Sequence, residues 1–349
     1  MPSAQLLFLK DNQFNYSEIL AWDDIPLPDE PFVDAWQEYI QDIARQGVLD
    51  ALSKRLVQLQ FPIQAGMSTN PNYLLATRRG LPTTTMPEAT GTQFEDPSNL
   101  KVYLHQTLAG RIPVIETSNR TDFETLVRVF SRRNEPVPIP ASMGACMIKG
   151  YNNWDRVASY KRQQAENFDF NQMKGQKHLY QDVFLILTDN GYSGVPAEML
   201  GLAEDEWCRL SMTIRREHEA THYFTLRCLG SARNHLLDEF IADYMGIVAA
   251  AGRYRADWFL CFMGLENYPA FRSGGRLTNY LNNVELSEPA FELLKTYVKQ
   301  AAENIERIGQ KYYDQVYSAQ GKYEMLLRLT KTNLMELAAE DAEERIFGY

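Results

Sequence analysis

The sequence predicts an α+β fold with a small sheet in its first part and mostly helices in its second. Stretches rich in β-branched and aromatic residues at 102–105, 112–115 and 183–188 are typical of strands. After Glu204 the apolar residues recur every three or four positions, which indicates helices near 204–229, 234–251, 254–264, 288–318 and 320–346. We therefore expect a mixed α/β region over residues 1–200 and a helical region over residues 201–349, folded as one cooperative unit.

Further elements are expected among the first 150 residues. Apolar residues at helical spacing predict a helical stretch from Phe32 to Leu56. The segment 80–91, rich in Thr, Pro and Gly, indicates a long surface loop, which is either functional or disordered. A helix is expected over 122–133. Prolines at 136, 138 and 140 then lead into residues 141–148, which we expect along the rim of a sheet, because proline is confined to strand edges.

The composition restricts the class of protein. The 349 residues are 45% hydrophobic and 23% charged, which suits a globular chain with a full core. A net charge of −10 argues against a nucleic-acid partner, because phosphate binding requires a basic face. We find no secretory signal and no apolar run long enough for a membrane span. The four cysteines show no C-x-x-C pairing, so the chain is expected in a reducing, cytoplasmic compartment.

The residues His218-Glu219-Ala220-Thr221-His222 form the H-E-x-x-H pattern of zinc hydrolases. On an α-helix, positions four apart lie on the same face, so both imidazoles can reach one metal ion. Glu219 then projects beside the ion, where it can take a proton from a metal-bound water. The apolar seam of this helix begins at Trp207, and both histidines continue it inward. Two buried, hydrogen-bonded histidines without a metal are the alternative.

The next predicted helix carries Glu239 and Asp243 four residues apart, hence on one face. Gly230 is expected to end the first helix, and Ser231 or Asn234 to cap the second. Because buried carboxylates are costly without a cation, we expect Glu239 to join the two imidazoles as a third zinc ligand. Asp243 then suits the orientation of a ligand imidazole through its other N–H. A solvent-facing acidic stripe is the alternative.

This combination, His218-Glu-x-x-His222 followed by Glu239-x-x-x-Asp243, resembles the gluzincin group of zinc metallopeptidases. The segment Glu239-Phe-Ile-Ala-Asp243 is also similar to the Glu-x-x-Ala-Asp segment of CAAX-processing peptidases. The resemblance covers about residues 215–247. It implies a zincin-like fold, one Zn²⁺ ion bound by His218, His222 and Glu239, a general base at Glu219 and a supporting role for Asp243. Neither the membrane helices of the CAAX group nor the substrate strand of thermolysin is evident, so a substrate class is not implied.

Other metal assignments fit the sequence less well. Asp238 points about 100° away from Glu239 around the helix, whereas His235 can in principle bind a metal. A metzincin requires a histidine at position 228, where this chain has Cys228. A di-iron carboxylate bundle shares the spacing of Glu219 and His222, but it needs a second Glu-x-x-His on another helix, which the sequence lacks.

The expected activity is hydrolysis of a peptide bond by zinc-activated water, which also requires a donor for the tetrahedral oxyanion. Candidate donors near the motif are Tyr223, His235, Tyr244 and Arg233. The strand over 183–188 is a candidate for pairing with an extended peptide substrate, and an ordinary core strand is its alternative. Two other functions stay open: an inactive zincin-like scaffold that binds a protein partner through the C-terminal helices, and a zinc hydrolase that acts on non-peptide amides.

Overall fold

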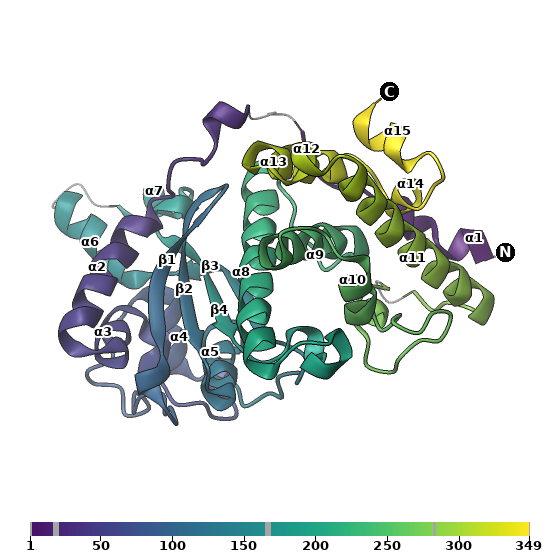
Figure 1. The fold of residues 1–349 in the computed structure, drawn as a ribbon. Helices are drawn as coiled ribbons and strands as arrows, with labels where there is room; N and C mark the ends of the chain where they lie inside the picture. The colour runs from purple at the N-terminus through teal and green to yellow at the C-terminus, as the bar shows by residue number, and fades with distance from the viewer. Residues whose placement is uncertain (1, 17–20, 165–168, 282–283, 349) are drawn as a thin grey trace. The chain divides into compact units, whose positions relative to one another are not determined.

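The computed structural model describes residues 2–16, 21–164, 169–281 and 284–348. It divides the chain into two compact units (Figure 1). One unit comprises residues 26–189, and the other combines residues 1–25 with residues 190–349. The expected boundary after residue 200 lies near the observed one, but the first 25 residues belong with the helical part of the chain.

The unit of residues 26–189 contains a four-stranded sheet with the strand order β1-β2-β4-β3. Its strands are β1 (Lys101–Thr107), β2 (Gly110–Thr117), β3 (Ala145–Asn152) and β4 (Gln181–Thr188). Strand β2 pairs antiparallel with β1 and parallel with β4, and β3 pairs antiparallel with β4. The prediction of an α+β chain with a small sheet is thus confirmed. Strand β3 lies at an edge of the sheet, as its proline-rich approach predicted.

Strand β4 lies in the interior of this sheet, with both sides of its backbone paired. Residues 184–188 are all buried. The prediction that residues 183–188 form an edge strand for a peptide substrate is therefore wrong, and the alternative of a core strand is correct. Its unbroken apolar run is the pattern expected for a strand that is covered on both faces, rather than the alternation of a half-exposed strand.

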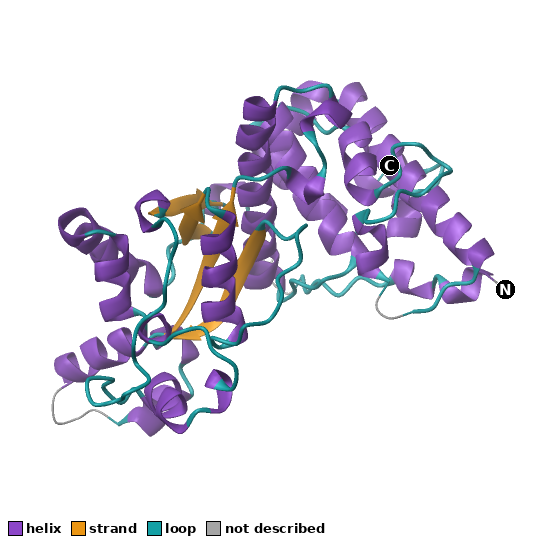
Figure 2. Cartoon of the chain, turned by 90° about the horizontal axis from the view of Figure 1, so that it is seen from below, coloured by secondary structure: helices purple, strands orange, loops and turns teal. Residues whose placement is uncertain are grey.

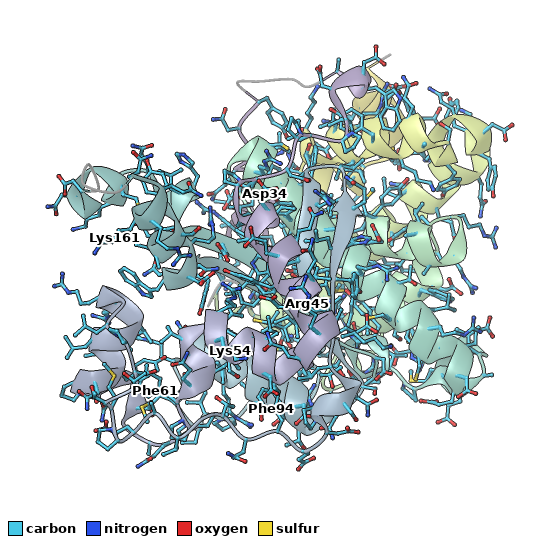
Figure 3. The ribbon with its side chains drawn as sticks, turned by 90° about the vertical axis from the view of Figure 1, so that its left-hand side faces the viewer. Asp34, Arg45, Lys54, Phe61, Phe94 and Lys161 are labelled. Carbon is cyan, nitrogen blue, oxygen red and sulfur yellow. The ribbon has the colours of Figure 1, made fainter. Side chains whose placement is uncertain are left out.

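Helices of this unit pack against the sheet (Figure 2). They are α2 (Phe32–Gln46), α3 (Val48–Arg55), α4 (Pro71–Arg79), α5 (Arg120–Arg132), α6 (Trp154–Gln164) and α7 (Phe170–Lys174). The rings of Trp36 on α2 and Phe130 on α5 each lie 5.1 Å from the ring of Phe184 on β4. Asp34, Arg45 and Lys54 are exposed and mark the outer side of α2 and α3 in Figure 3.

The Thr- and Pro-rich segment after α4 contains no helix or strand until the short 3-10 helix Pro97–Asn99, as predicted. Met86 and Ala89 from this segment pack against a buried cluster of Phe61, Met67, Tyr73 and Ala76. The segment therefore contributes to the core of its own unit. That role decides against disorder, because these two apolar side chains are packed against neighbours.

The second unit is helical. Its helices are α1 (Pro2–Gln5), α8 (Glu204–Leu229), α9 (Leu236–Ala251), α10 (Ala256–Met263), α11 (Glu288–Lys311), α12 (Tyr313–Tyr317), α13 (Ala319–Thr330), α14 (Leu334–Leu337) and α15 (Ala342–Phe347). None of the helices in the described ranges is long and apolar enough to cross a membrane. None of the four cysteines, all of which lie in the described ranges, forms a disulfide bond.

The two long C-terminal helices predicted over 288–318 and 320–346 are interrupted. Ser318 and Asn333 each accept a hydrogen bond at a new helix start, from Gly321 N–H and Glu336 N–H respectively. Ser318 lies at the expected boundary between the two helices, whereas the breaks at Tyr312, where α11 ends, and at Asn333 were not predicted. The apolar residues of α11 and α13 are buried within the unit, as the core-packing account of these helices requires.

Among the described helices of this unit, α8 and α9 make the most extensive contact with each other. Gly246 of α9 lies against Ile214 of α8, and a Cβ atom at position 246 would meet the Ile214 carbonyl oxygen at 2.7 Å. The carbonyl cannot give way as a flexible side chain would, because it belongs to a helix backbone. Glycine at position 246 therefore sets how closely the two helices approach.

We expect Gly246→Ala to destabilise the protein by about 1–3 kcal/mol, because the added methyl group overpacks a backbone contact. The free energy of unfolding in urea measures this cost. Gly175→Ala is the matched control, since Gly175 has an ordinary negative φ and no atom within 4 Å of the added Cβ. Equal stability of the two variants would contradict the role assigned to Gly246.

Candidate metal centre

Helix α8 carries the histidine motif on its buried face. Trp207, Ser211, Ile214, His218 and His222 are all buried, so the predicted inward seam is confirmed. The helix begins at Glu204, where three acidic residues in the first turn complement the positive end of the helix dipole. It ends at Gly230 in the left-handed conformation (φ 67°), as predicted for its C-cap.

Helix α9 brings two carboxylates against the motif. Glu239 contacts His222, and Asp243 contacts His218. The earlier residue of each helix thus meets the later residue of the other, so the two helices are antiparallel. Glu239 and Asp243 are both buried, and Asp243 is fully shielded from solvent. The predicted acidic face therefore points at the imidazoles, and the alternative of a solvent-facing stripe is wrong.

One ligand atom from each of His218, His222 and Glu239 lies within 4.8 Å of the others. The Nε2 atoms of the two histidines are 3.1 Å apart. The Glu239 carboxylate oxygens lie 3.5 Å from each of these nitrogens, Oε2 from His218 and Oε1 from His222. Ligand atoms of three buried residues thus lie close together, and these residues could hold a metal ion.

The separations agree with the dimensions of a zinc site. A tetrahedral ion with ligands at about 2.0–2.1 Å keeps its ligand atoms about 3.3 Å apart. The 3.1 Å between the two imidazole nitrogens lies near that value, and each nitrogen has one of the two Glu239 carboxylate oxygens at 3.5 Å. The donor set of two imidazoles and one carboxylate leaves one tetrahedral position for water or substrate.

Glu219 follows His218 on α8 and is partly exposed, unlike the three converging residues. It lies close enough to His222 to influence the pKa of that imidazole. Its carboxylate is therefore beside the ligand group and is not one of the three donors that converge.

A second ring of hydrogen bonds surrounds His218. Asp243 Oδ1 lies 2.9 Å from His218 Nδ1, and the Tyr192 hydroxyl, which donates to the same oxygen at 2.6 Å, lies 3.0 Å from that nitrogen. Arg276 Nη2 donates to the other oxygen, Oδ2, and Arg276 Nη1 donates to the Tyr192 hydroxyl at 3.3 Å. Arg276 Nη1 also lies 3.9 Å from Glu239. One guanidinium therefore contacts both carboxylates that α9 contributes.

This ring determines the tautomer of His218. Asp243 accepts bonds only, so Nδ1 must carry the proton that fills the 2.9 Å contact. A bare Nδ1 would direct its lone pair at the carboxylate, which is repulsive. In the neutral form of His218, which carries one proton, Nε2 then presents a free lone pair toward His222 and Glu239.

The site also shifts the pKa values of its members. Burial alone would raise the pKa of Glu239, but the hydrogen bond from His222 and the charges of His218, His222 and Arg276 lower it to about 2. For His222, burial lowers the pKa, but Glu239 and then Glu219 outweigh burial and raise it above its usual value. Burial raises the pKa of Tyr192 well above its ordinary value, so its hydroxyl stays protonated and can donate to Asp243.

Three polar residues at the start of α9 have other partners. His235 is the N-cap of α9: its Nδ1 accepts from Leu237 N–H, and its Nε2 lies 3.1 Å from the Phe8 carbonyl. The expected cap at Ser231 or Asn234 and the candidate roles of His235 as ligand or oxyanion donor are therefore wrong. Asp238 accepts from the Arg233 backbone N–H at 2.8 Å, which agrees with its exclusion as a ligand, and the Arg233 side chain is exposed.

The tyrosine candidates Tyr223 and Tyr244 directly follow His222 and Asp243 in sequence, but their side chains leave the helix about 100° away. The Tyr244 ring packs on Tyr254 at 5.3 Å. Its hydroxyl is buried and has no hydrogen-bond partner among the described residues. Tyr244 is therefore part of an aromatic core and not an oxyanion donor. Tyr223 is buried on α8, and its role as a donor stays a prediction.

Tyr192 and Arg276 are site residues that the sequence did not reveal. Tyr192 belongs to a short 3-10 helix, Tyr192–Gly194, and Arg276 to another, Arg276–Tyr280. Neither segment has a helical or strand periodicity that assigns a direction to its side chains. The one available signal was the glycine-rich sequence before each residue, which marks a turn without indicating what the turn faces.

Comparison with known proteins adds a family but no function. A family model described as a family of unknown function (DUF7005) matches residues 2–341. No curated protein and no solved structure matches the chain. The chemistry of the site must therefore be argued from its own residues.

Proposed function

Because the chain belongs to a family of unknown function (DUF7005), we propose its activity from the site itself: a zinc-dependent metallopeptidase that hydrolyses peptide bonds, with Glu219 as general base. The observation that carries this proposal is the convergence of His218, His222 and Glu239 within 4.8 Å, with Glu219 beside them. The same residues carry the resemblance to gluzincin metallopeptidases. The contact between Asp243 and His218 adds the supporting carboxylate that the resemblance implies.

The donor set favours zinc over the common hard cations. Magnesium and calcium prefer six or more oxygen ligands, whereas two imidazoles and a carboxylate suit zinc. Charge supports a divalent ion as well. With neutral imidazoles, Glu219, Glu239 and Asp243 supply three negative charges and Arg276 supplies one positive charge. A divalent cation brings this group to neutrality.

A bound zinc ion would polarise the scissile carbonyl and lower the pKa of water in its open position. Glu219 then accepts the proton of the attacking water and delivers it to the leaving amine. His218, His222 and Glu239 hold the ion, and the hydrogen bond from His218 to Asp243 fixes the imidazole orientation. Glu219 suits the proton transfer because it is partly exposed, so water and substrate can reach its carboxylate.

The choice of a peptide over another amide rests on the gluzincin resemblance. A zinc hydrolase of non-peptide amides would use the same residues, and a zincin-like scaffold would keep the ion without turnover. The structure gives the scaffold less support, because the apolar faces of α11 and α13 are buried in their own unit.

The test measures zinc content and peptide hydrolysis in the full-length protein. We expect about one zinc ion per chain by elemental analysis and cleavage of an unstructured protein substrate or a mixed peptide library. A chelator should abolish cleavage, and added zinc should restore it. Magnesium is the control ion, and it should restore nothing.

The outcomes separate the candidates. Absence of zinc from the purified protein, together with no uptake of added zinc, would refute the metal assignment. Stoichiometric zinc without turnover of any amide would favour the scaffold. Turnover of small amides without cleavage of peptides would keep the zinc hydrolase and replace its substrate class.

A further inference from the structure

We propose that Tyr192 and Arg276 are positioning residues that hold Asp243 in one orientation and thereby fix the tautomer of His218. The inference rests on the proposed function in one respect: the purpose of the tautomer is to leave the Nε2 lone pair free for a metal ion. The tautomer itself can be observed without metal. Neither residue belongs to the motif, and they come from segments on opposite sides of it in the sequence.

Tyr192 is held in place from α8. Its backbone N–H donates to Ser211 Oγ at 2.9 Å, and Arg215 donates to the carbonyl of Gly191 at 2.9 Å. The next residue, Ser193, has a φ of 57°, in the left-handed region that a non-glycine residue rarely adopts. Such backbone strain persists where the surrounding structure over-determines a position, and it is concentrated at functional sites. The turn therefore directs the Tyr192 hydroxyl at the Asp243 carboxylate.

Arg276 is held in place by a close backbone approach and by aromatic rings. A Cβ atom on Gly275 would lie 2.5 Å from the Gly264 Cα, so the two glycines anchor the arginine segment to the end of α10. The guanidinium carbon lies 4.9 Å from the ring centre of Tyr192 and 6.0 Å from that of Tyr280. The side chain is only 12% exposed. A stacked, planar guanidinium with several donors can serve two carboxylates at once, which a lysine ammonium cannot do in the same way.

Together these residues leave Asp243 one arrangement of its hydrogen bonds. Arg276 donates to Oδ2, and the Tyr192 hydroxyl and His218 Nδ1 both bind Oδ1. The same hydroxyl also lies 3.0 Å from His218 Nδ1, so it contacts both partners of this bond. Rotation of the carboxylate would break several of these bonds inside a site with no solvent to replace them, since Asp243 is fully buried. Without Tyr192 or Arg276 the carboxylate can turn, and His218 is then free to place its proton on Nε2, where it blocks a metal ion.

The test is imidazole ¹⁵N NMR of the metal-free protein labelled at its 5 histidines, with His218→Gln used to assign the signal. In the wild type we expect His218 to be protonated at Nδ1 and bare at Nε2, which gives two well-separated ¹⁵N shifts. In Tyr192→Phe and Arg276→Gln the two shifts should move toward a common averaged value. Arg276→Lys keeps the charge and should restore the wild-type pattern in part.

Matched controls keep the same residue types. Tyr254→Phe removes a buried hydroxyl that has no hydrogen-bond partner among the described residues. Arg272→Gln removes an arginine four positions earlier in the chain, which binds Glu266 and the Cys261 carbonyl. Both controls should retain the wild-type ¹⁵N shifts of His218. Wild-type shifts in Tyr192→Phe and Arg276→Gln would overturn the proposal, and so would a global loss of folded signals in Tyr192→Phe.

A zinc titration of the same variants separates this inference from the proposed function. Tyr192→Phe and Arg276→Gln should bind zinc about 10–100-fold more weakly than the wild type, the usual effect of removing outer partners of a metal ligand. Unchanged affinity would overturn the positioning role for metal binding. If the wild type takes up no zinc, the proposed function fails, while the ¹⁵N shifts still decide whether Tyr192 and Arg276 fix the tautomer.

Discussion

Glu219→Gln is expected to keep one zinc ion per chain and to lose peptide hydrolysis by about 10²–10⁴-fold, the usual contribution of a general base. The ion should stay because Glu219 is not among the three residues whose donor atoms converge. The rate should fall because an amide cannot accept the proton of the attacking water. Glutamine is close to glutamate in size, so packing next to His222 is preserved.

Elemental analysis and the initial rate of peptide cleavage, measured on one preparation, test this prediction. Glu217→Gln is the matched control on the same helix, since Glu217 pairs with Arg216 and lies outside the ligand group. It should retain both zinc and activity. A wild-type rate in Glu219→Gln would remove the general-base role and leave the metal assignment standing. Loss of zinc from this variant would instead show that Glu219 helps to bind the ion.

The metal-binding core of the site could be predicted because it depends on local geometry. Residues four apart on a helix share a face, so His218 with His222 and Glu239 with Asp243 form pairs in any helical arrangement. Only the docking of one helix on the other had to be assumed, and a short turn between them made that assumption natural. The contact of Gly246 with Ile214 shows how close the docking is, and no periodicity could reveal it.

Tyr192 and Arg276 could not be predicted because their positions depend on tertiary structure alone. Each lies in a short 3-10 helix, more than 25 residues from His218 or Glu239 in the sequence, and the directions of their side chains follow from backbone contacts. His235 shows the opposite error. His235 lies next to the site in the sequence, but its Nε2 contacts the Phe8 carbonyl of the N-terminal segment. Proximity in the sequence therefore suggested a site role for His235 that the structure does not support, and it gave no indication of Tyr192 and Arg276.

For the fold, the individual strands and helices were predictable from the sequence, but their arrangement was not. Strands and helices with a strong pattern were found where expected, including β4 and α8. The order of the strands in the sheet could not be predicted from the sequence. For strand β4 an edge and a core position were both open, and only the observed strand order places its apolar run in the interior. Helix ends inside a continuing apolar pattern, as at Asn333, depend on a few capping hydrogen bonds.

Zinc is expected to stabilise the wild type against unfolding, and Glu239→Gln is expected to remove this stabilisation. At a free zinc concentration one hundred times the dissociation constant, the gain is about 2.7 kcal/mol, because the ion binds the folded state and lacks a formed site in the unfolded state. Ligands from both α8 and α9 contribute to the site, so the ion links the two helices that are in closest contact in their unit. Thermal or urea unfolding with and without zinc measures the gain.

Glu239→Gln tests the linkage because it replaces a buried anionic donor by a neutral amide of the same shape. Its stability should be the same with and without zinc, while Glu217→Gln should show the full gain of the wild type. Magnesium should stabilise none of the three proteins, since two imidazole donors do not suit it. A zinc-dependent gain that survives in Glu239→Gln would mean that the ion binds elsewhere on the chain. Equal stability of the wild type with and without zinc would argue that His218, His222 and Glu239 form a hydrogen-bonded cluster and not a metal centre.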